Sequence, residues 1–309
     1  MSANGAVPAE LHEPMRRAVR LEWWNIGFTI SIVIVMGLVL GNSQTMKTAW
    51  VEDTLGLIPP IVFLVAIRFE RKGAARDFPF GFARVHSLAF LIAAVALALV
   101  GAMLLWDSVS TLAAREHATV ASIHIFGRDL WLGWLMLGAQ LYSIVPPLII
   151  GRLEMPLART MQDEVLFTDS KMNKANWQTG AAGLAGVIGL GLGWWWADSV
   201  AAAFISIGII ADGWRALRIA TAELVDGVPR ALGGIGPDPE ARLLMAKLER
   251  QYPGAVIRLR ETGRYIHAEV CGVDPDFRQN LRALWPGAPE RSWRLAQLAF
   301  VPPHQEEAA

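Results

Sequence analysis

Long apolar segments, separated by short polar ones, dominate the chain up to about residue 220. Crossing the hydrocarbon core of a bilayer takes roughly 20 mostly apolar residues in a helix. Six segments have this character, at about 22–41, 48–69, 86–113, 130–151, 164–192 and 195–220. The pattern therefore predicts an all-α bundle of six transmembrane helices, within a domain over residues 22–226.

The pattern changes after Asp226. Glycine and proline concentrate in residues 227–238, which predicts a linker. Beyond the linker, apolar residues recur with the period of a helix and then alternate as in two strands, before a second helix and a last strand. This αββαβ order over residues 239–303 predicts a small ferredoxin-like α+β domain.

Basic residues gather before the first apolar segment, between the second and third, and after the sixth. The positive-inside rule then puts both termini in the cytoplasm. We accordingly expect residues 1–21 to be a cytoplasmic segment of a multi-pass protein in a bacterial inner membrane. Because 28 basic residues balance 28 acidic ones, no nucleic-acid partner is expected. The sequence also has no catalytic or phosphate-binding motif, so we expect neither an enzyme nor a cofactor.

Ionisable side chains inside membrane spans are costly, which makes them candidates for function. The second segment carries Glu52 and Asp53. In the fifth, four residues recur at i, i+3, i+4 and i+7 and so share a helix face, namely Asp169, Met172, Asn173 and Asn176. Because the two segments run in opposite directions, their polar stretches can meet at similar depth. We therefore predict that these residues form a functional site inside the bundle.

Four stretches, in this order along the chain, carry a resemblance to a known family. They are "GNSQTMKTAWVEDTLG" (41–56), "DFPFGFARVHSL" (77–88), "FTDSKMNKANW" (167–177) and "WWWADSVAAAFISIGIIADGWRAL" (194–217). Together with the tail, they resemble the cation diffusion facilitator family of divalent-metal transporters over nearly the whole chain. The resemblance implies proton-coupled efflux of a divalent cation, as an antiporter, by a homodimer whose cytoplasmic domains make dimer contacts.

The resemblance also places the family's four metal ligands on Glu52, Gly56, Met172 and Asn176. Zinc in proteins takes histidine, cysteine or carboxylate ligands, so these residues do not predict the family's usual zinc site. Two further positions depart from the family. His86 replaces a glutamate in the loop, and Ala299 stands where many members have a metal-binding histidine.

Three interpretations of this altered site remain open. In the one we favour, oxygen ligands suit a harder cation such as manganese, iron(II) or magnesium, and come from Glu52, Asp53, Asp169, Asn173 and Asn176. In the second, Lys47, Lys171 or Lys174 pairs with an acid and replaces the metal, so that the chain is a non-transporting partner or scaffold subunit. In the third, the lysines extend to the membrane interface and the site is vacant.

Overall fold

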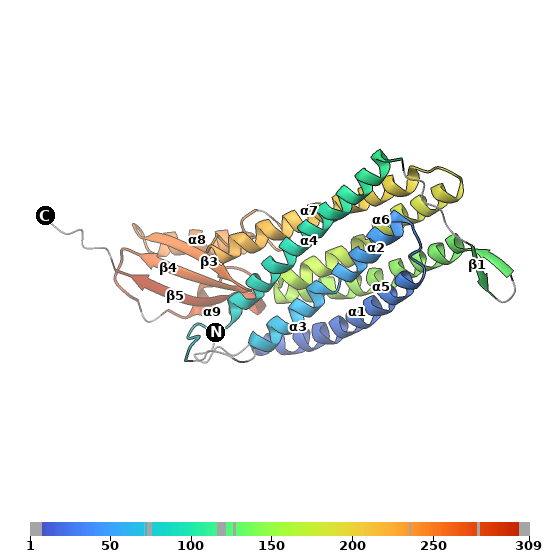
Figure 1. Ribbon diagram of the computed structural model, residues 1–309. Helices are drawn as coiled ribbons and strands as arrows, with labels where there is room; N and C mark the ends of the chain where they lie inside the picture. Colours follow the sequence, from blue (N-terminus) through green and yellow to red (C-terminus); the bar gives the residue numbers. More distant parts are fainter. Residues whose placement is uncertain are drawn as a thin grey trace.

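The computed structural model describes residues 8–70, 72, 76–115, 122–125, 128–234, 236–276 and 279–302. The side chain of His86, residues 1–7 and residue 303 lie outside that description. Long helices run side by side through most of the molecule, and a small sheet domain extends from one end (Figure 1). The hairpin of β1 (Ser122–Ile125) and β2 (Arg128–Trp131) lies at the opposite end. We call these two ends the sheet end and the hairpin end.

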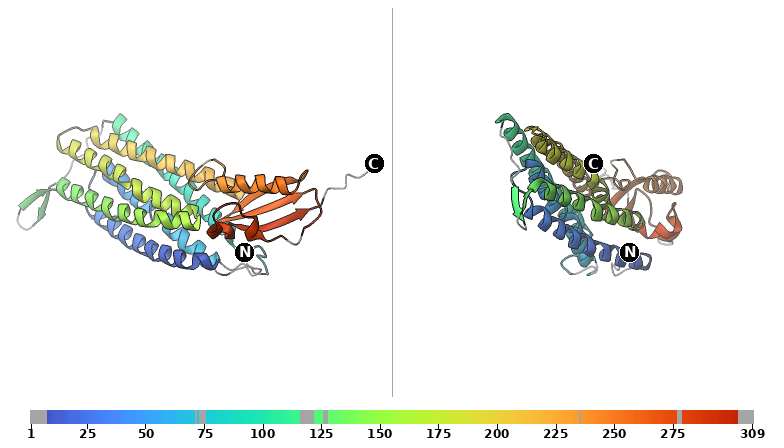
Figure 2. Two further views of the ribbon diagram at one scale, coloured as in Figure 1. Left: turned by 180° about the vertical axis from the view of Figure 1, so that it is seen from behind. Right: turned by 90° about the vertical axis from the view of Figure 1, so that its right-hand side faces the viewer.

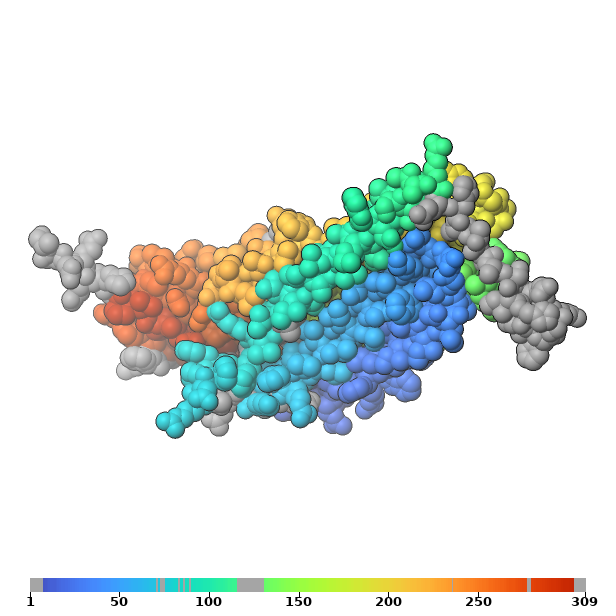
Figure 3. Space-filling view, in the orientation of Figure 1, coloured from blue at the N-terminus to red at the C-terminus, as the bar shows by residue number. Residues whose placement is uncertain are grey.

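The bundle is built from helices whose passes alternate in direction between these ends, with α2 and α3 together making one pass. They are α1 (His12–Leu38), preceded by the 3-10 turn η1 (Ala9–Leu11), α2 (Gln44–Leu55), α3 (Ile58–Glu70), α4 (Ala83–Ala113), α5 (Leu132–Met161), α6 (Glu164–Gly191) and α7 (Ala197–Leu224). In the space-filling view, α1, the α2–α3 pair and α4 form adjacent bands across one face (Figure 3).

Five helical segments in the described part of the chain are long and apolar enough to cross a membrane. They are Ala9–Leu38, Gln44–Glu70, Phe90–Ala113, Leu132–Met161 and Ala197–Leu224. The fifth predicted span, 164–192, also forms a helix, α6, but it does not meet the same criterion of composition. The reason is its first half, where Asp169, Lys171 and Lys174 interrupt the apolar residues. Nevertheless, α6 packs along α5 and α7 inside the bundle.

The second predicted span is divided into two helices, because α2 ends at Leu55 and α3 begins at Ile58. Pro59 and Pro60 lie in the first turn of α3. Proline has no backbone N–H, so neither residue can donate to the carbonyl four residues back. The carbonyl groups of Leu55 and Gly56 therefore lack the donor that a continuous helix would supply.

A glycine brings α5 and α6 close together near the sheet end. A Cβ atom added to Gly151 would lie 2.6 Å from the backbone oxygen of Ser170 and 2.8 Å from the Cβ of Asn173. Any larger residue would push the two helices apart. This close contact sets the spacing between the polar side chains that the two helices carry on either side of it.

The sheet domain contains a three-stranded sheet in the order β3 (Val256–Thr262), β4 (Tyr265–Cys271) and β5 (Leu295–Val301). β3 and β4 pair antiparallel, whereas β4 and β5 pair parallel. Helix α8 (Pro239–Gln251) packs on the sheet through Leu244 and Leu248, which are fully buried.

The second helix predicted for this domain is much shorter than expected. Helix α9 covers only Leu281–Leu284, and a 3-10 segment, η2 (Pro289–Arg294), precedes β5. Asn280 caps α9, because its side chain accepts a hydrogen bond from the backbone N–H of Arg282. Pro286 follows after Trp285 and prevents the helix from continuing. The described part of the domain is therefore a three-stranded α+β unit, without the full ferredoxin-like pattern.

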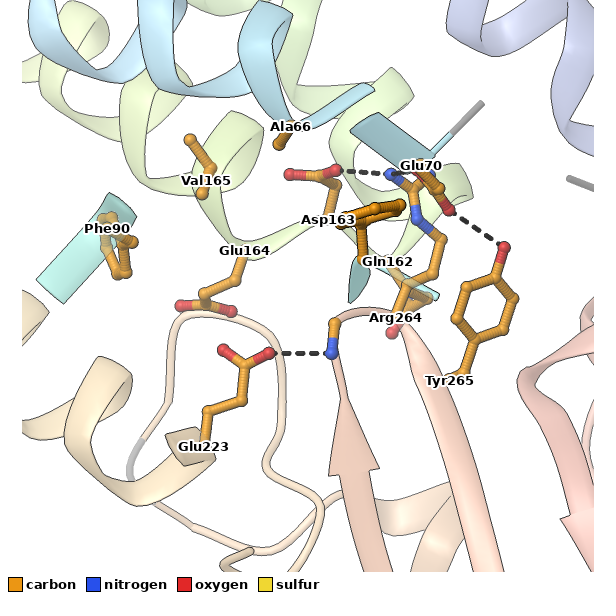
Figure 4. Close-up of a pocket in the computed structure, with 12 residues that line it drawn as sticks. Ala66, Glu70, Phe90, Gln162, Asp163, Glu164, Val165, Glu223, Arg264 and Tyr265 are labelled. Atoms are coloured by element: carbon orange, nitrogen blue, oxygen red, sulfur yellow. Dashed lines mark hydrogen bonds and ion pairs between the residues drawn. The ribbon is translucent and has the colours of Figure 1, made fainter. Parts of the chain in front are cut away.

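The sheet domain is attached to the bundle by a buried arginine, Arg264, in the turn before β4. Its guanidinium group lies 2.9 Å from the carboxylate of Asp163, between α5 and α6, and 3.2 Å from that of Glu70, at the end of α3. The hydroxyl group of Tyr265 also donates to Glu70 (Figure 4). Burial would lower the pKa of Arg264, but the two carboxylates raise it, so it remains charged. Figure 2 shows the domain from two further sides.

Candidate functional site

Glu52 and Asp53 lie in the last turn of α2, directly before the break between α2 and α3. The Thr179 hydroxyl group of α6 donates a hydrogen bond of 3.1 Å to Glu52 Oε1. Within the described part of the chain, Glu52 Oε2 and Asp53 Oδ2 are inaccessible to solvent and have no hydrogen-bond partner. Asp212 of α7 is near enough to act electrostatically on Glu52. The break in the second span therefore presents carboxylate oxygens that the protein itself leaves unsatisfied.

Two of the residues predicted to bind metal have other roles in the structure. Met172 packs in an apolar cluster with Val51 and Leu55 of α2. The amide of Asn176 donates a hydrogen bond of 2.9 Å to the backbone carbonyl of Ser143 on α5. That carbonyl has no helical donor, since the residue four positions on is Pro147. Asn176 thus compensates for a proline in the neighbouring helix.

Asp169 and Asn173 lie in a second polar group, nearer the sheet end. Asp169 Oδ2 accepts hydrogen bonds from the amide groups of Asn25 on α1, at 2.8 Å, and of Asn173, at 3.3 Å. The Asn173 amide also lies 3.4 Å from Glu154 Oε2 on α5. Glu22 of α1 completes the group, since one oxygen atom each from Glu22, Glu154 and Asp169 lie within 4.8 Å of one another. All three carboxylates are buried.

The two polar groups lie at different depths of the bundle. Asp169 precedes Thr179 by ten residues on α6, which is about 15 Å along a helix that rises 1.5 Å per residue. The structure thus separates residues that the sequence analysis joined in one site. Glu52 and Asp53 lie at the level of Thr179, whereas Asp169 and Asn173 lie nearer the sheet end.

Glu22 and Glu154 are functional candidates that the sequence analysis did not identify. Glu22 was taken as the first residue of a span, and Glu154 lay beyond the expected end of another, at residue 151. In the structure α1 begins at His12 and α5 continues to Met161, so both acids lie within helices. The sequence feature that could have identified them is a charged side chain at the end of a long apolar segment.

The lysines predicted to replace the metal show no such pairing. Lys47 Nζ lies 2.6 Å from Asp107 Oδ2 of α4, and both side chains are partly exposed. No lysine ion pair involving described residues reaches Glu52, Asp53 or Asp169. The interpretation in which a tethered ammonium group replaces the cation thus gains no support.

An acidic pocket lies where the bundle meets the sheet domain (Figure 4). Glu164, at the start of α6, accepts hydrogen bonds from the backbone N–H of Gly233. Glu223 of α7 accepts one of 2.8 Å from that of Gly263. Since Glu70 and Asp163 pair with Arg264, the acids that line this pocket hold the domain in place.

Comparison with known proteins agrees with this architecture. The family model for the cation efflux transmembrane domain matches residues 24–225. A manganese efflux system protein of Bacillus subtilis, MneS, is 22% identical over 197 residues, which cover 64% of this chain and 63% of that protein. The chain therefore spans slightly less than two thirds of MneS. An uncharacterized transporter of the same species, YdbO, is 23% identical over 252 residues, which cover 80% of this chain and 81% of YdbO.

The family match covers most of the helix bundle, including α2 and α6 with their polar residues. Members of this family are transporters rather than enzymes. Together with the long apolar helices, the match indicates an integral membrane protein. The chain belongs to the cation efflux family, the cation diffusion facilitators that its sequence resembles.

Proposed function

We propose that this protein exports a divalent cation in exchange for protons, and that Glu52 is the principal ligand for the cation. The observation that carries the proposal is the pair of unsatisfied oxygens, Glu52 Oε2 and Asp53 Oδ2, buried beside a break in a membrane helix. Buried polar groups normally have partners. A cation that passes through the bundle would supply one.

The break offers further oxygen ligands. The carbonyl groups of Leu55 and Gly56 lack a helical donor because Pro59 and Pro60 follow. In membrane transporters, carbonyls of interrupted helices serve as cation ligands. Gly56 is the position at which the family places its second ligand, so a backbone oxygen would take the role of the missing side chain.

An all-oxygen site favours a hard cation over zinc. The relative MneS is named as a manganese efflux protein. Manganese is therefore our first candidate for the cargo. This choice depends on ligand chemistry together with a relative of low identity.

Proton exchange follows from the burial of the ligands. A buried carboxylate without a positive partner is very costly, and such groups are normally neutral. When the cation leaves, Glu52 and Asp53 would take up protons, and these would be released when the next cation binds. Export would thus be coupled to proton entry.

The wider architecture belongs to the same proposal. We place α6 across the membrane as the fifth of six spans, because it packs between α5 and α7. We place both termini and the sheet domain in the cytoplasm. The transmembrane domain would cover 22–226, the linker 227–238 and the cytoplasmic domain 239–303. We further propose a homodimer in a bacterial inner membrane.

Transport by purified protein in proteoliposomes tests the proposal. With an imposed proton gradient, wild-type protein should move Mn²⁺, and Glu52→Gln should abolish the flux. Asp107→Asn is the control, because Asp107 pairs with Lys47 away from the proposed site. Absence of flux for manganese, iron, cobalt, zinc and magnesium would refute the proposal, as would wild-type flux in Glu52→Gln.

A further inference from the structure

We propose that Glu22, Glu154 and Asp169 form a second cation site, distinct from Glu52 and Asp53, and that it takes a hard divalent cation. Asn25 would provide a neutral ligand. The site would lie between α1, α5 and α6, near the sheet end of the bundle. The inference does not depend on Glu52 being a transport ligand.

The three carboxylates have the spacing that one ion requires. One oxygen atom from each lies within 4.8 Å of the other two. Ligands on opposite sides of a cation, each about 2.2 Å from it, are about 4.4 Å apart. Glu22 and Glu154 are fully buried and Asp169 is 2% exposed, so an ion held here would be shielded from solvent.

The amide of Asn25 provides an independent indication of a ligand. Asn25 is 1% exposed, and its nitrogen is fixed at the cluster by the 2.8 Å hydrogen bond to Asp169. In the described structure, its Oδ1 atom has no hydrogen-bond partner. A buried amide oxygen normally accepts a hydrogen bond, and a cation at the cluster would satisfy it once the amide turned this oxygen toward the ion.

The protein supplies too few donors to satisfy the acids. The hydrogen bonds to them come from the amides of Asn25 and Asn173. Both oxygens of Glu22 and Glu154 Oε1 have no partner among described residues. No basic side chain in the described part of the chain forms an ion pair with any of the three acids. Three carboxylates this close repel one another unless a cation or protons intervene.

The donor atoms define the class of cation. All are carboxylate or amide oxygens, which suit Mn²⁺, Mg²⁺ or Ca²⁺ rather than a cation that prefers nitrogen or sulfur. Because the site lies about 15 Å along α6 from the level of Glu52, an ion bound here would occupy a separate position in the same bundle.

Manganese binding to the full-length protein in detergent, without a proton gradient, tests this inference. Electron paramagnetic resonance measures free Mn²⁺, so the titration gives the number of bound ions. We expect Glu22→Gln or Asp169→Asn to bind one ion fewer than wild-type protein does, with affinity at the altered site reduced about 10-fold or more. Glu52→Gln should keep the ion at the cluster. Glu13→Gln, an exposed glutamate on the same helix as Glu22, should titrate like wild type.

Two results would overturn the inference. One is that Glu22→Gln and Asp169→Asn both titrate like wild type. The other is a single bound ion in wild type that Glu52→Gln removes. If the variants do not fold, anomalous scattering at the manganese edge on wild-type crystals tests the inference. Anomalous density between the three carboxylates would support the site. Anomalous density found only elsewhere would refute it. A protein that binds the ion here but transports nothing would refute only the proposed function.

Discussion

Two regions of the bundle bury acidic side chains equally well but satisfy them very differently. At the hairpin end, Asp198 of α7 is fully buried and accepts hydrogen bonds from the Ser43 hydroxyl at 2.6 Å and from the backbone N–H of Gln44 at 2.6 Å and Thr45 at 3.2 Å. Near the sheet end, Glu22 is also fully buried, but neither of its oxygens accepts a well-formed hydrogen bond within the described residues, although the side chain of Asn25 lies close to it. Burial alone therefore does not mark a ligand site.

The difference follows from what each acid contacts. Asp198 meets the first turn of α2, where backbone N–H groups have no helical acceptor. The backbone carbonyl of Asp198 also accepts a 2.6 Å hydrogen bond from the Thr45 hydroxyl group. This bond joins the start of α7 to the start of α2. Glu22 instead faces the acids of α5 and α6, and the nearby amide of Asn25 donates its hydrogen bond to Asp169. A buried acid that contacts hydrogen-bond donors can serve a structural role. A buried acid that contacts other acids needs a cation or a proton to offset their repulsion.

The largest effect that we expect is from Asp198→Ala. The three donors would lose their acceptor, at about 1–3 kcal/mol each, so the free energy of unfolding should fall by roughly 3–9 kcal/mol. Unfolding by SDS in mixed micelles, followed by tryptophan fluorescence, measures it. Asp107→Asn is the control, because Asp107 is partly exposed. A loss below about 1 kcal/mol would show that these hydrogen bonds do not make Asp198 structural.

An intermediate effect is expected at Glu261 of the sheet domain, which has some partners. It accepts hydrogen bonds from the Arg294 guanidinium and the Arg230 backbone N–H. Burial nevertheless raises its pKa from 4.5 to about 7, although Arg294 lowers it. Because the folded protein binds this proton more tightly, the associated stability is fully present below pH 4.5 and is lost as the pH rises to about 7.

Glu261→Gln should remove this pH dependence, which we expect to be roughly 3 kcal/mol across the window. Melting temperatures of the full-length protein, measured against pH for variant and wild type, test the prediction. Glu249→Gln, at an exposed position on α8, should follow the wild-type curve. A difference between Glu261→Gln and wild type that stays constant with pH would contradict it.

The smallest effect, and one of opposite sign, is expected for Glu22→Gln without divalent cations. The change removes a buried acid that repels its neighbours and supplies an amide donor, so stability should rise by about 1 kcal/mol. The SDS titration used for Asp198→Ala measures this as well. A destabilisation comparable to that of Asp198→Ala would erase the distinction between the two regions.

The sequence predicted the helices of the bundle more accurately than it predicted which polar side chains contact one another. The lengths of the apolar segments located the helices, because a membrane span requires a long apolar segment whichever helices pack against it. Charge on α6 marked Asp169 and Asn173 as unusual. It could not show that they face Glu154 and Glu22, because that depends on which helices are adjacent.

Other contacts escaped the sequence analysis for similar reasons. The i+7 spacing put Asn176 on the polar face, but its partner is a carbonyl that Pro147 leaves free on another helix. Glu154 was overlooked because a helix can continue past its apolar segment. The short α9 depends on a cap at Asn280 and on Pro286, which periodicity alone does not weigh.

The attachment of the sheet domain has a mechanical consequence. A single guanidinium group, that of Arg264, holds both Glu70 at the end of α3 and Asp163 before α6. The ends of these helices therefore cannot move apart without breaking one of the two ion pairs. The domain thus links α3 to α6, and a change in the tilt of one helix relative to the other would strain the turn before β4 that carries Arg264.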